Sequence, residues 1–469
     1  MRTSRVLGLA GVVVVLLTSA ACRKSRASRD DQSTSSADPT TETKKPVDGI
    51  TEDRIRLGQV ASLTGAQAGL GAESYRGSMA YFLEVNAKGG VHGRTIELVP
   101  ADDKYTADGG ESATDRLMAE EEPFGFVSAT GTEPSTGIVK SLKKHEAKGL
   151  FLWGSTSGAE VLRKGEYAKL AWNLRGSLDA AATDVANAFA GAGFKKMGIV
   201  FQDDGFGKSA AGSAKRACEA KGLSVVAELS IAKTTKPDSG DAKELIAKAK
   251  AAGVEALFLA ATYNPATVVI RDARESGWNV PAGVMSSPDT MVRQLVAIEK
   301  KTGKRMTNAV LGCADAPPVN ATDLPAVREY RELSDKRNPQ LPAQIADPNY
   351  RPLRYSTNAL EAFINAKALV EALNRAGRNL TRDGLRKAAE SMNGWDAGVG
   401  QPITWGPGDN QGFDNVWLPG LKNEELTLIA DLKKYLTDKP EPVVKGDASA
   451  APSASAAPSA AAAKPPAKK

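Results

Sequence analysis

The sequence predicts an α/β protein of two lobes, each built on a parallel sheet that helices cover on both faces. Short apolar runs alternate with segments of 3.6-residue periodicity from residue 55 to residue 300, which is typical of parallel sheets. Between polar ends lie about 390 residues, too many for one ordinary domain and enough for two. Polar, glycine-rich loops follow several apolar runs, as at residues 203–207, and such loops meet at the sheet edge where small ligands bind.

The first part of the chain supplies most of the expected strands. We expect them at residues 55–60, 95–99, 125–128, 150–153, 197–201, 224–229, 256–260 and 282–285. Helices fall between them. The helix at 73–87 stops at glycines directly after Lys88, and the helix at 239–252 starts with Ser239 as its cap. This alternation of strand and helix is what predicts parallel pairing.

The rhythm breaks twice, and the breaks divide the chain between the lobes. Residues 170–177 form a strand that leads into a new helix from Leu178, where the chain enters a second lobe. After Pro317 the expected helices are at residues 324–338, 355–374 and 381–392, and short strand-like runs follow a turn-rich segment. We assign residues 53–174 and 315–400 to an N-terminal lobe and residues 175–314 and 401–438 to a C-terminal lobe. The pattern alone leaves the number of crossings open.

The two ends of the chain predict export and flexible flanks. Two arginines, an apolar run and small residues before Cys22 form a secretory signal over residues 1–22, which resembles a bacterial lipobox. Cys22 is therefore expected to carry a lipid that anchors the protein on the periplasmic or cell-surface face of a bacterial membrane. An ordinary signal with a chance cysteine is the alternative. The polar residues 23–48 predict a disordered tether, and residues 439–469, rich in Ala, Pro, Ser and Lys, a disordered tail.

The composition argues against nucleic-acid binding and against several kinds of catalysis. The net charge of +6 comes with both signs interleaved and with no basic stripe that carries aromatic rings. Two histidines, His92 and His145, and no metal-binding or phosphate-binding motif predict a protein that is not an enzyme and holds no metal or cofactor. The segment around Thr156 resembles a nucleophile elbow, but no partner histidine is apparent. Cys218 and Cys313 are either buried thiols or one disulfide.

Side chains suited to recognition gather in loops after the expected strands. Two loops carry hydroxyl groups: Ser128, Thr130, Thr132 and Ser135 in the first, and Ser155, Thr156 and Ser157 in the second. Hydroxyls and free N–H groups at a helix N-terminus suit a carboxylate, although such residues also cap helices. Later loops supply acids and aromatic rings: Asp203, Asp204, Phe206, Tyr263 and Asp289. These suit an ammonium, although an Asp in a turn often bonds locally.

Several motifs occur in one order: Ser62-Leu-Thr-Gly65, the glycines 71 and 77, Asn86-Ala-Lys-Gly-Gly90, Asp102-Asp103 and the run from Phe201 to Lys208. Through these motifs the chain resembles the type I periplasmic binding proteins, and their branched-chain amino-acid subgroup most. The resemblance covers the chain from Asp53 to Leu436. It implies two Rossmann-like lobes, joined by three crossings, that close on a ligand for a membrane permease with ATPase subunits. No catalysis is implied.

The same resemblance, with the loop chemistry, implies a ligand-binding set: Leu70, Thr130, Thr132, Ser155, Thr156, Phe206, Tyr263 and Asp289. In the family, Thr130 or Thr132 would hold the ligand carboxylate and Asp289 the ammonium. Phe206 lacks a hydroxyl that some members carry, Leu70 reduces the aromatic wall, and Asp289 is shorter than the usual Glu. A branched-chain amino acid is the expected ligand. Amides, aromatic acids and other small carboxylates are the alternatives.

Two other functions are compatible with the same sequence. A ligand-sensing receptor of this fold would pass occupancy of its site to a signalling partner and not to a permease. An exported hydrolase would need a nucleophile in the cleft, and the sequence offers none in a convincing setting. We expect a monomer in either of the binding roles.

Overall fold

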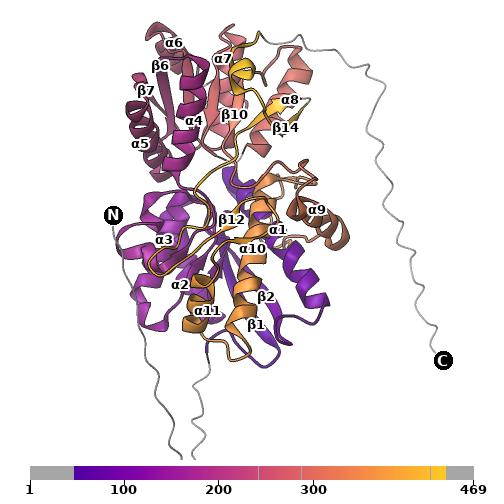
Figure 1. Cartoon of the computed structure of the whole chain (residues 1–469). Coiled ribbons are helices and arrows are strands. Elements are labelled where there is room, and N and C mark those ends of the chain that lie inside the picture. The colour runs from indigo at the N-terminus through magenta and orange to yellow at the C-terminus, as the bar shows by residue number, and fades with distance from the viewer. Residues whose placement is uncertain (1–46, 241, 287, 423, 440–469) are drawn as a thin grey trace, which may run out of the picture. The chain divides into compact units, whose positions relative to one another are not determined.

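The computed structural model describes residues 47–240, 242–286, 288–422 and 424–439 (Figure 1). The expected signal peptide with Cys22, nearly all of the expected tether and all but one residue of the expected tail lie outside these residues. Within them, no helix combines the length and the apolar character that crossing a membrane requires. This part of the chain folds into two lobes that carry separate sheets.

The first lobe is built on a five-stranded sheet in the order β2-β1-β3-β4-β5, and every pair in it is parallel. Its strands are β1 (Arg54–Ala61), β2 (Thr95–Asp102), β3 (Phe126–Val127), β4 (Leu152–Trp153) and β5 (Ala171–Trp172). Its first helices are α1 (Ala68–Ala87), α2 (Ala107–Glu120) and α3 (Thr132–Lys144), with 3-10 turns η1 (Gly65–Gln67), η2 (Glu146–Lys148), η3 (Glu160–Leu162) and η4 (Gly165–Leu170). The predicted parallel α/β class is confirmed.

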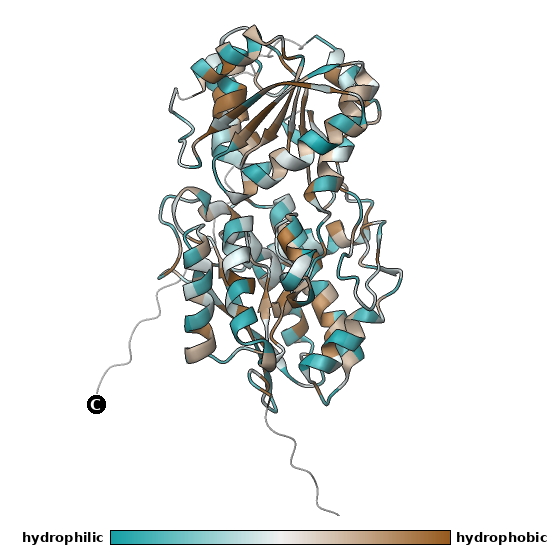
Figure 2. Ribbon diagram, turned by 90° about the vertical axis from the view of Figure 1, so that its left-hand side faces the viewer, coloured by the Kyte–Doolittle hydropathy of each residue, from teal (hydrophilic) through white to brown (hydrophobic). Residues whose placement is uncertain are grey.

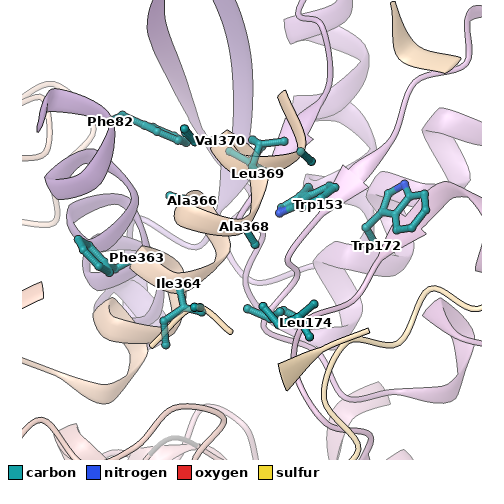
Figure 3. Close-up of a cluster of buried hydrophobic side chains, with 14 of the residues drawn as sticks. Phe82, Trp153, Trp172, Leu174, Phe363, Ile364, Ala366, Ala368, Leu369 and Val370 are labelled. Carbon is teal, nitrogen blue, oxygen red and sulfur yellow. The ribbon is translucent and has the colours of Figure 1, made fainter. Parts of the chain in front are cut away.

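Three helices from late in the sequence complete the first lobe: α9 (Pro325–Arg337), α10 (Thr357–Ala376) and α11 (Arg382–Glu390). A short antiparallel pair, β11 (Trp395–Asp396) and β12 (Pro402–Ile403), follows them. Figure 3 shows α10 running through the core of this lobe, with Leu369 between Phe82 of α1 and the ring of Trp153. Because α10 is buried on nearly every side, the residues at its N-terminus are fixed in position.

The second lobe carries a seven-stranded sheet in the order β14-β13-β10-β9-β8-β6-β7. Its strands are β6 (Lys196–Gln202), β7 (Ser224–Ile231), β8 (Ala256–Ala260), β9 (Ala282–Val284), β10 (Val310–Gly312), β13 (Pro419–Lys422) and β14 (Glu425–Leu428). Its helices are α4 (Leu178–Ala192), α5 (Gly205–Ala220), α6 (Lys243–Ala251), α7 (Tyr263–Glu275), α8 (Asp289–Thr302) and α12 (Leu432–Thr437). Figure 2 shows its central strands as apolar ribbons beneath helices with hydrophilic outer residues. β13 pairs antiparallel with both β10 and β14, and the other strand pairs of this sheet are parallel.

Two helices begin at other residues than the pattern suggests. α6 begins at Lys243, because the Ser239 hydroxyl donates to Lys236 O in a preceding turn and does not cap the helix. α1 begins at Ala68, five residues before the predicted start, in a turn that approaches the end of β1 closely. There Gly71 N donates to Ser62 O at 3.1 Å, and a Cβ on Gly71 would lie 2.2 Å from that oxygen.

Three segments cross between the lobes and are bonded into one ribbon. The first crossing follows β5, the second follows β10, and the third precedes β13. The third lies between the other two: Phe413 N donates to Leu174 O at 2.9 Å, and Trp417 N donates to Ala314 O at 2.8 Å. The three-crossing hinge implied by the resemblance is confirmed.

The packing of Trp405 bears on the expected lobe boundary at residue 400. The Trp405 ring packs edge-on against Trp153 and Trp172 of the first lobe, with ring centroids 4.9 and 5.7 Å apart. Such edge-to-face packing of buried rings holds a segment firmly. We therefore propose that the first lobe extends past Trp405 and that the chain enters the second lobe between Phe413 and Trp417.

Candidate ligand-binding site

A cavity lies between the lobes, at the carboxyl ends of strands from both sheets. It contains about 450 Å³ of space between atoms, part of it open to solvent. Its lining residues are Leu70, Tyr105, Gly131, Thr132, Thr156, Gly158, Arg175, Phe206, Thr262, Tyr263, Ser286 and Asn358. Loops after β2, β3 and β4 and the helices α1 and α10 supply the first-lobe side. Loops after β6, β8 and β9 supply the other side, and Arg175 belongs to the first crossing.

The structure brings five residues of the expected binding set together at this cavity: Leu70, Thr132, Thr156, Phe206 and Tyr263. The other three, Thr130, Ser155 and Asp289, do not line it. The cavity also has polar lining residues that the sequence analysis did not single out: Tyr105, Arg175, Thr262, Ser286 and Asn358. Most of these follow strands in loops, but nothing in the sequence distinguishes them from other loop residues.

The N-terminus of α3 forms one end of the cavity. Gly131 precedes the helix with φ 84°, and a Cβ there would lie 2.4 Å from the Tyr105 ring, so only glycine fits without displacement. The Thr132 hydroxyl bonds to the Ser157 hydroxyl at 2.9 Å, and Gly131 N donates to Thr156 Oγ1 at 3.3 Å. Hydroxyls at the positive end of a helix dipole make this end suited to a carboxylate.

Tyr105 is held in the cavity wall by a loop that Asp103 and Asp102 support, and Asp102 Oδ1 accepts from Lys104 N at 3.1 Å. Lys104 and Tyr105 both have positive φ, 54° and 57°, a backbone conformation that needs support in residues with side chains. Asp103 Oδ1 supplies it by accepting from Tyr105 N at 2.8 Å, and it also accepts from Ser62 Oγ at 2.6 Å. Burial raises the pKa of the Asp103 carboxyl to about 7, although both hydrogen bonds oppose that shift. The Asp pair of the motif thus positions a tyrosine.

Thr130 and Ser155 hold the loops together and do not line the cavity. Thr130 Oγ1 accepts from Ser62 N at 2.9 Å, which ties the loop after β3 to the end of β1. Ser155 Oγ bonds to Ser135 Oγ at 2.7 Å and accepts from Ser157 N at 3.2 Å. In a loop rich in hydroxyls the sequence does not tell which face each hydroxyl takes, and these two face the protein.

Asp289 lies at a contact between the lobes. Its Oδ1 accepts from both Thr357 N and Thr357 Oγ1, at 2.9 and 3.0 Å, so the carboxyl joins the first residue of α8 to the first residue of α10. Its Oδ2 is buried and has no hydrogen-bond partner. Burial raises the pKa of Asp289 to about 6, and the bonds to Thr357 limit the shift. This carboxyl is engaged by protein donors and does not line the cavity.

Other contacts show that the lobes meet on both sides of the cavity. On one side Tyr263 OH donates to Ala66 O at 2.6 Å, and Gln67 Nε2 donates to Thr262 Oγ1 at 3.0 Å. On the other side Glu133 of α3 accepts from Gly205 N at 3.2 Å and pairs with Lys233 Nζ at 2.9 Å: contacts to α5 and to the loop after β7. The structure is therefore a closed arrangement of the two lobes.

Arg175 and Asn358 form the end of the cavity that faces the hinge. The Arg175 guanidinium contacts Glu361 through Nε at 2.9 Å and Nη2 at 2.7 Å, and Asp315 through Nη1 at 3.0 Å. Burial alone would lower the pKa of Arg175, but the charges of Asp315 and Glu361 outweigh it and raise that pKa. Asn358 Nδ2 donates to Leu70 O at 2.8 Å. These contacts join the first and second crossings to α10.

The histidines and cysteines stand apart from the cavity. His92 Nε2 lies 3.2 Å from Asn374 O, and His145 follows the last turn of α3. Cys218 and Cys313 are buried free thiols, so they do not form the disulfide that the sequence left open. Among the residues that the structure describes, no group of three or more His, Cys, Asp or Glu side chains is arranged to hold a metal ion.

Comparisons with known proteins agree with this architecture. A sequence profile of the family described as periplasmic binding protein matches residues 54–424. Among curated proteins, the Leu/Ile/Val-binding protein homolog 8 of Brucella abortus (strain 2308) is 24% identical over 359 residues, which cover 72% of this chain and 80% of that protein. The match therefore extends over both lobes.

Two solved structures show the same fold. A possible leucine/isoleucine/valine-binding protein from Rhodopirellula baltica SH 1 superposes with a TM-score of 0.70 at 24% identity, covering 84% of this chain and 100% of that chain. A fatty acid ABC transporter substrate-binding protein from Thermomonospora curvata gives a TM-score of 0.67 at 25% identity, covering 83% and 96%. Proteins named for quite different carboxylates thus share this arrangement of lobes.

Proposed function

Because this chain belongs to the periplasmic binding protein family, we propose that it captures a small carboxylate between its two lobes and delivers it to an ABC permease. Proteins of this family bind solutes and are not enzymes, so the chain is a binding protein. Membership of the family also implies an extracytoplasmic location.

The observation that carries the proposal is the cavity at the N-terminus of α3, enclosed by residues of both lobes. Thr132 and Thr156 offer hydroxyls beside the free N–H groups of the first helical turn, a setting that favours a carboxylate. Leu70 and Phe206 supply apolar surface for a short carbon chain. A ligand that contacts both lobes stabilises the closed state over an open one, which is how binding would drive closure.

Two classes of carboxylate are candidates for the ligand. Leucine, isoleucine and valine are the first candidate ligands, because the similar proteins from Brucella and Rhodopirellula are named for them. Carboxylates without an ammonium come second, because the Thermomonospora protein is named for fatty acids and because Asp289, the expected partner of an ammonium, is engaged by Thr357. Amides and aromatic acids belong to the same panel.

The wider setting follows from the proposed transport role. A lipid on Cys22 would hold the protein at a bacterial membrane, and a monomer would dock on a permease with its ATPase subunits. The second candidate role, a receptor of the same fold that reports to a signalling partner, uses the same cavity. The genes beside this one would separate the two roles: a permease and an ATPase favour transport, and a kinase or regulator favours sensing.

Thermal melting of the purified full chain tests the proposal. We would titrate amino acids, small amides, aromatic acids, fatty acids and dicarboxylates, because a bound ligand stabilises the folded state in proportion to the logarithm of its concentration over Kd. At least one carboxylate is expected to raise the melting temperature, while 3-methylbutan-1-amine, which is leucine without its carboxylate, is the matched control and should not. A protein whose melting temperature responds to no carboxylate, or equally to the amine, contradicts the proposal.

A further inference from the structure

The described residues that line the cavity carry positive charge but no negative charge. Arg175 is the one charged residue among the described residues that line it, and no carboxylate side chain lines it. Two acidic side chains next to the lining are occupied by other groups of the protein. Glu133 is bonded to Gly205 N and Lys233, and Asp204 accepts from Gly207 N and Gln202 Nε2. A ligand ammonium would therefore find no carboxylate among the described residues that line this cavity.

The Arg175 guanidinium has donors left for a ligand. Glu361 accepts one N–H from Nε and one from Nη2, and Asp315 forms an ion pair with Nη1 at 3.0 Å. A guanidinium carries five N–H groups, so one on each terminal nitrogen remains. Its two protein carboxylates fix its position, because Arg175 is 8% exposed and paired on two sides. A guanidinium fixed in this way is suited to an acidic group.

Asn358 offers an acceptor that lacks a donor. The side chain is 4% exposed, its Nδ2 donates to Leu70 O at 2.8 Å, and its Oδ1 is buried without a hydrogen-bond partner. The bond to a carbonyl fixes the orientation of the amide, so the unpartnered atom is the oxygen. Asn358 precedes Glu361 by three residues on α10 and therefore lies on the same helix face as the partner of Arg175.

We propose that the cavity selects a carboxylate whose second polar group is a neutral donor, such as the hydroxyl of a 2-hydroxy acid, and not an ammonium. The inference rests on the proposed function, since it specifies the carboxylate that the same site takes. An ammonium that enters the cavity loses its hydration and meets no carboxylate among the described lining residues, so its desolvation is not compensated there. A hydroxyl satisfies Asn358 Oδ1 and adds no charge.

Three acids with one carbon skeleton test this proposal: 2-hydroxy-4-methylpentanoate, 4-methylpentanoate and leucine. They differ in a single group on the carbon next to the carboxylate: a hydroxyl, a hydrogen or an ammonium. Calorimetric titration of the full chain is expected to give the tightest Kd for the hydroxy acid, with the plain acid about tenfold weaker and leucine about tenfold weaker again. Leucine binding as tightly as the hydroxy acid would overturn the proposal, and equal binding of the two acids would remove Asn358 from it.

The variant Asn358→Asp sharpens the test, because it keeps the shape of the side chain and adds a carboxylate, although it loses the hydrogen bond to Leu70 O, as the control variant loses its own bond to Gly154 O. The affinity of leucine relative to the hydroxy acid is expected to rise by about tenfold. Asn365→Asp is the matched control: Asn365 is also on α10 and also has a buried Oδ1 without a donor, but it does not line the cavity, so the ratio should not move.

The outcomes separate this inference from the function on which it rests. An unchanged ratio in Asn358→Asp, with a folded protein by circular dichroism, contradicts the role of Asn358. Preference for leucine in the wild-type protein refutes the inference and leaves a carboxylate-binding protein. Failure of all three acids and of every other carboxylate in the melting panel refutes the proposed function itself.

Discussion

The two ends of the cavity are built in different ways. The α3 end, formed by Gly131, Thr132 and Thr156, uses hydroxyls and backbone N–H groups from two neighbouring loops. The hinge end, formed by Arg175 and Asn358, uses a buried charge held by carboxylates from elsewhere in the chain: Glu361 lies 186 residues from Arg175. The α3 end therefore binds through local geometry, and the hinge end through long-range pairing.

This difference matters for closure, because the hinge end belongs to the hinge itself. Arg175 is in the first crossing, Asp315 is in the second, and Glu361 is in the helix that fills the first lobe. A ligand group that contacts Arg175 touches the part of the molecule that must move when the lobes open. The α3 end moves with the first lobe as a rigid body. A ligand group bound there contributes to affinity, but it does not contact the segments that move when the lobes open.

The largest expected effect is at the hinge end. Glu361→Gln removes one charge from a buried pair and leaves Arg175 without its bidentate partner, so we expect the free energy of unfolding to fall by about 3 kcal/mol. Urea unfolding followed by tryptophan fluorescence measures it. Glu244→Gln, in the exposed pair with Lys248 on α6, is the control and should change nothing measurable. Equal losses in the two variants would contradict the importance of burial at the hinge end.

The raised pKa of Asp289, at the contact between α8 and α10, predicts that the free energy of unfolding depends on pH. Its pKa is raised from 3.8 to about 6, so the folded protein binds a proton more tightly than the unfolded chain between these values. Stability from this group is therefore greatest below pH 4 and falls as the pH rises to about 6, by an amount on the order of 3 kcal/mol. Asp289→Asn keeps an acceptor for Thr357 and carries no charge at any pH.

The measurement is the difference in unfolding free energy between wild type and Asp289→Asn, taken from pH 4 to pH 8. Other groups titrate alike in the two proteins, so their contributions cancel. The unfolding free energy of the wild type, relative to that of Asp289→Asn, should fall as the pH rises to about 6 and stay constant above that pH. A difference that does not change with pH would mean that this carboxyl is not buried in the way the structure has it.

The sequence located most strands of the two sheets but not β10 at Val310–Gly312, and it singled out Thr132 and Thr156 of the α3 end; where it succeeded, the reason is local. β6 at Lys196–Gln202 lies within a residue of the predicted strand at each end, because an apolar run between polar loops determines it. The hydroxyls of the α3 end follow their strands directly, so proximity in sequence gave proximity in space. The predicted capping role of Ser239 failed because its hydroxyl is used by the preceding turn, a choice that the pattern does not contain.

The residues of the hinge end could not be predicted from the sequence, because they are positioned by contacts between distant parts of the chain. The position of Arg175 depends on Glu361, which lies beside it only because α10 returns to the first lobe. Asp289 was expected at the ammonium by resemblance, but its partner Thr357 lies 68 residues further on. The roles of the eight expected residues in binding stay predictions, and ligand titrations of the variants decide them.

The α3 end can be tested by crowding it. Gly131→Ala adds a Cβ that meets the Tyr105 ring at a backbone conformation unfavourable for alanine, so we expect a loss of about 2 kcal/mol in unfolding free energy and weaker ligand binding. Gly93→Ala is the matched control, because Gly93 has φ 83° and open space around its Cβ position. The control should lose less stability and no affinity. Similar effects in the two variants would show that the contact with Tyr105 carries no strain.

The smallest expected effect separates two threonines of neighbouring loops. Thr156→Val removes a hydroxyl that lines the cavity, and ligand binding should weaken by about 1 kcal/mol, or roughly fivefold in Kd, because the ligand loses one hydrogen bond. Thr130→Val removes a hydroxyl that accepts from Ser62 N and does not line the cavity, so stability should fall while Kd stays the same. Calorimetric titration of both variants with one carboxylate measures this. Equal losses of affinity would place Thr130 in the site after all, whereas unequal ones would show that the α3 end acts through the particular hydroxyls that face the ligand.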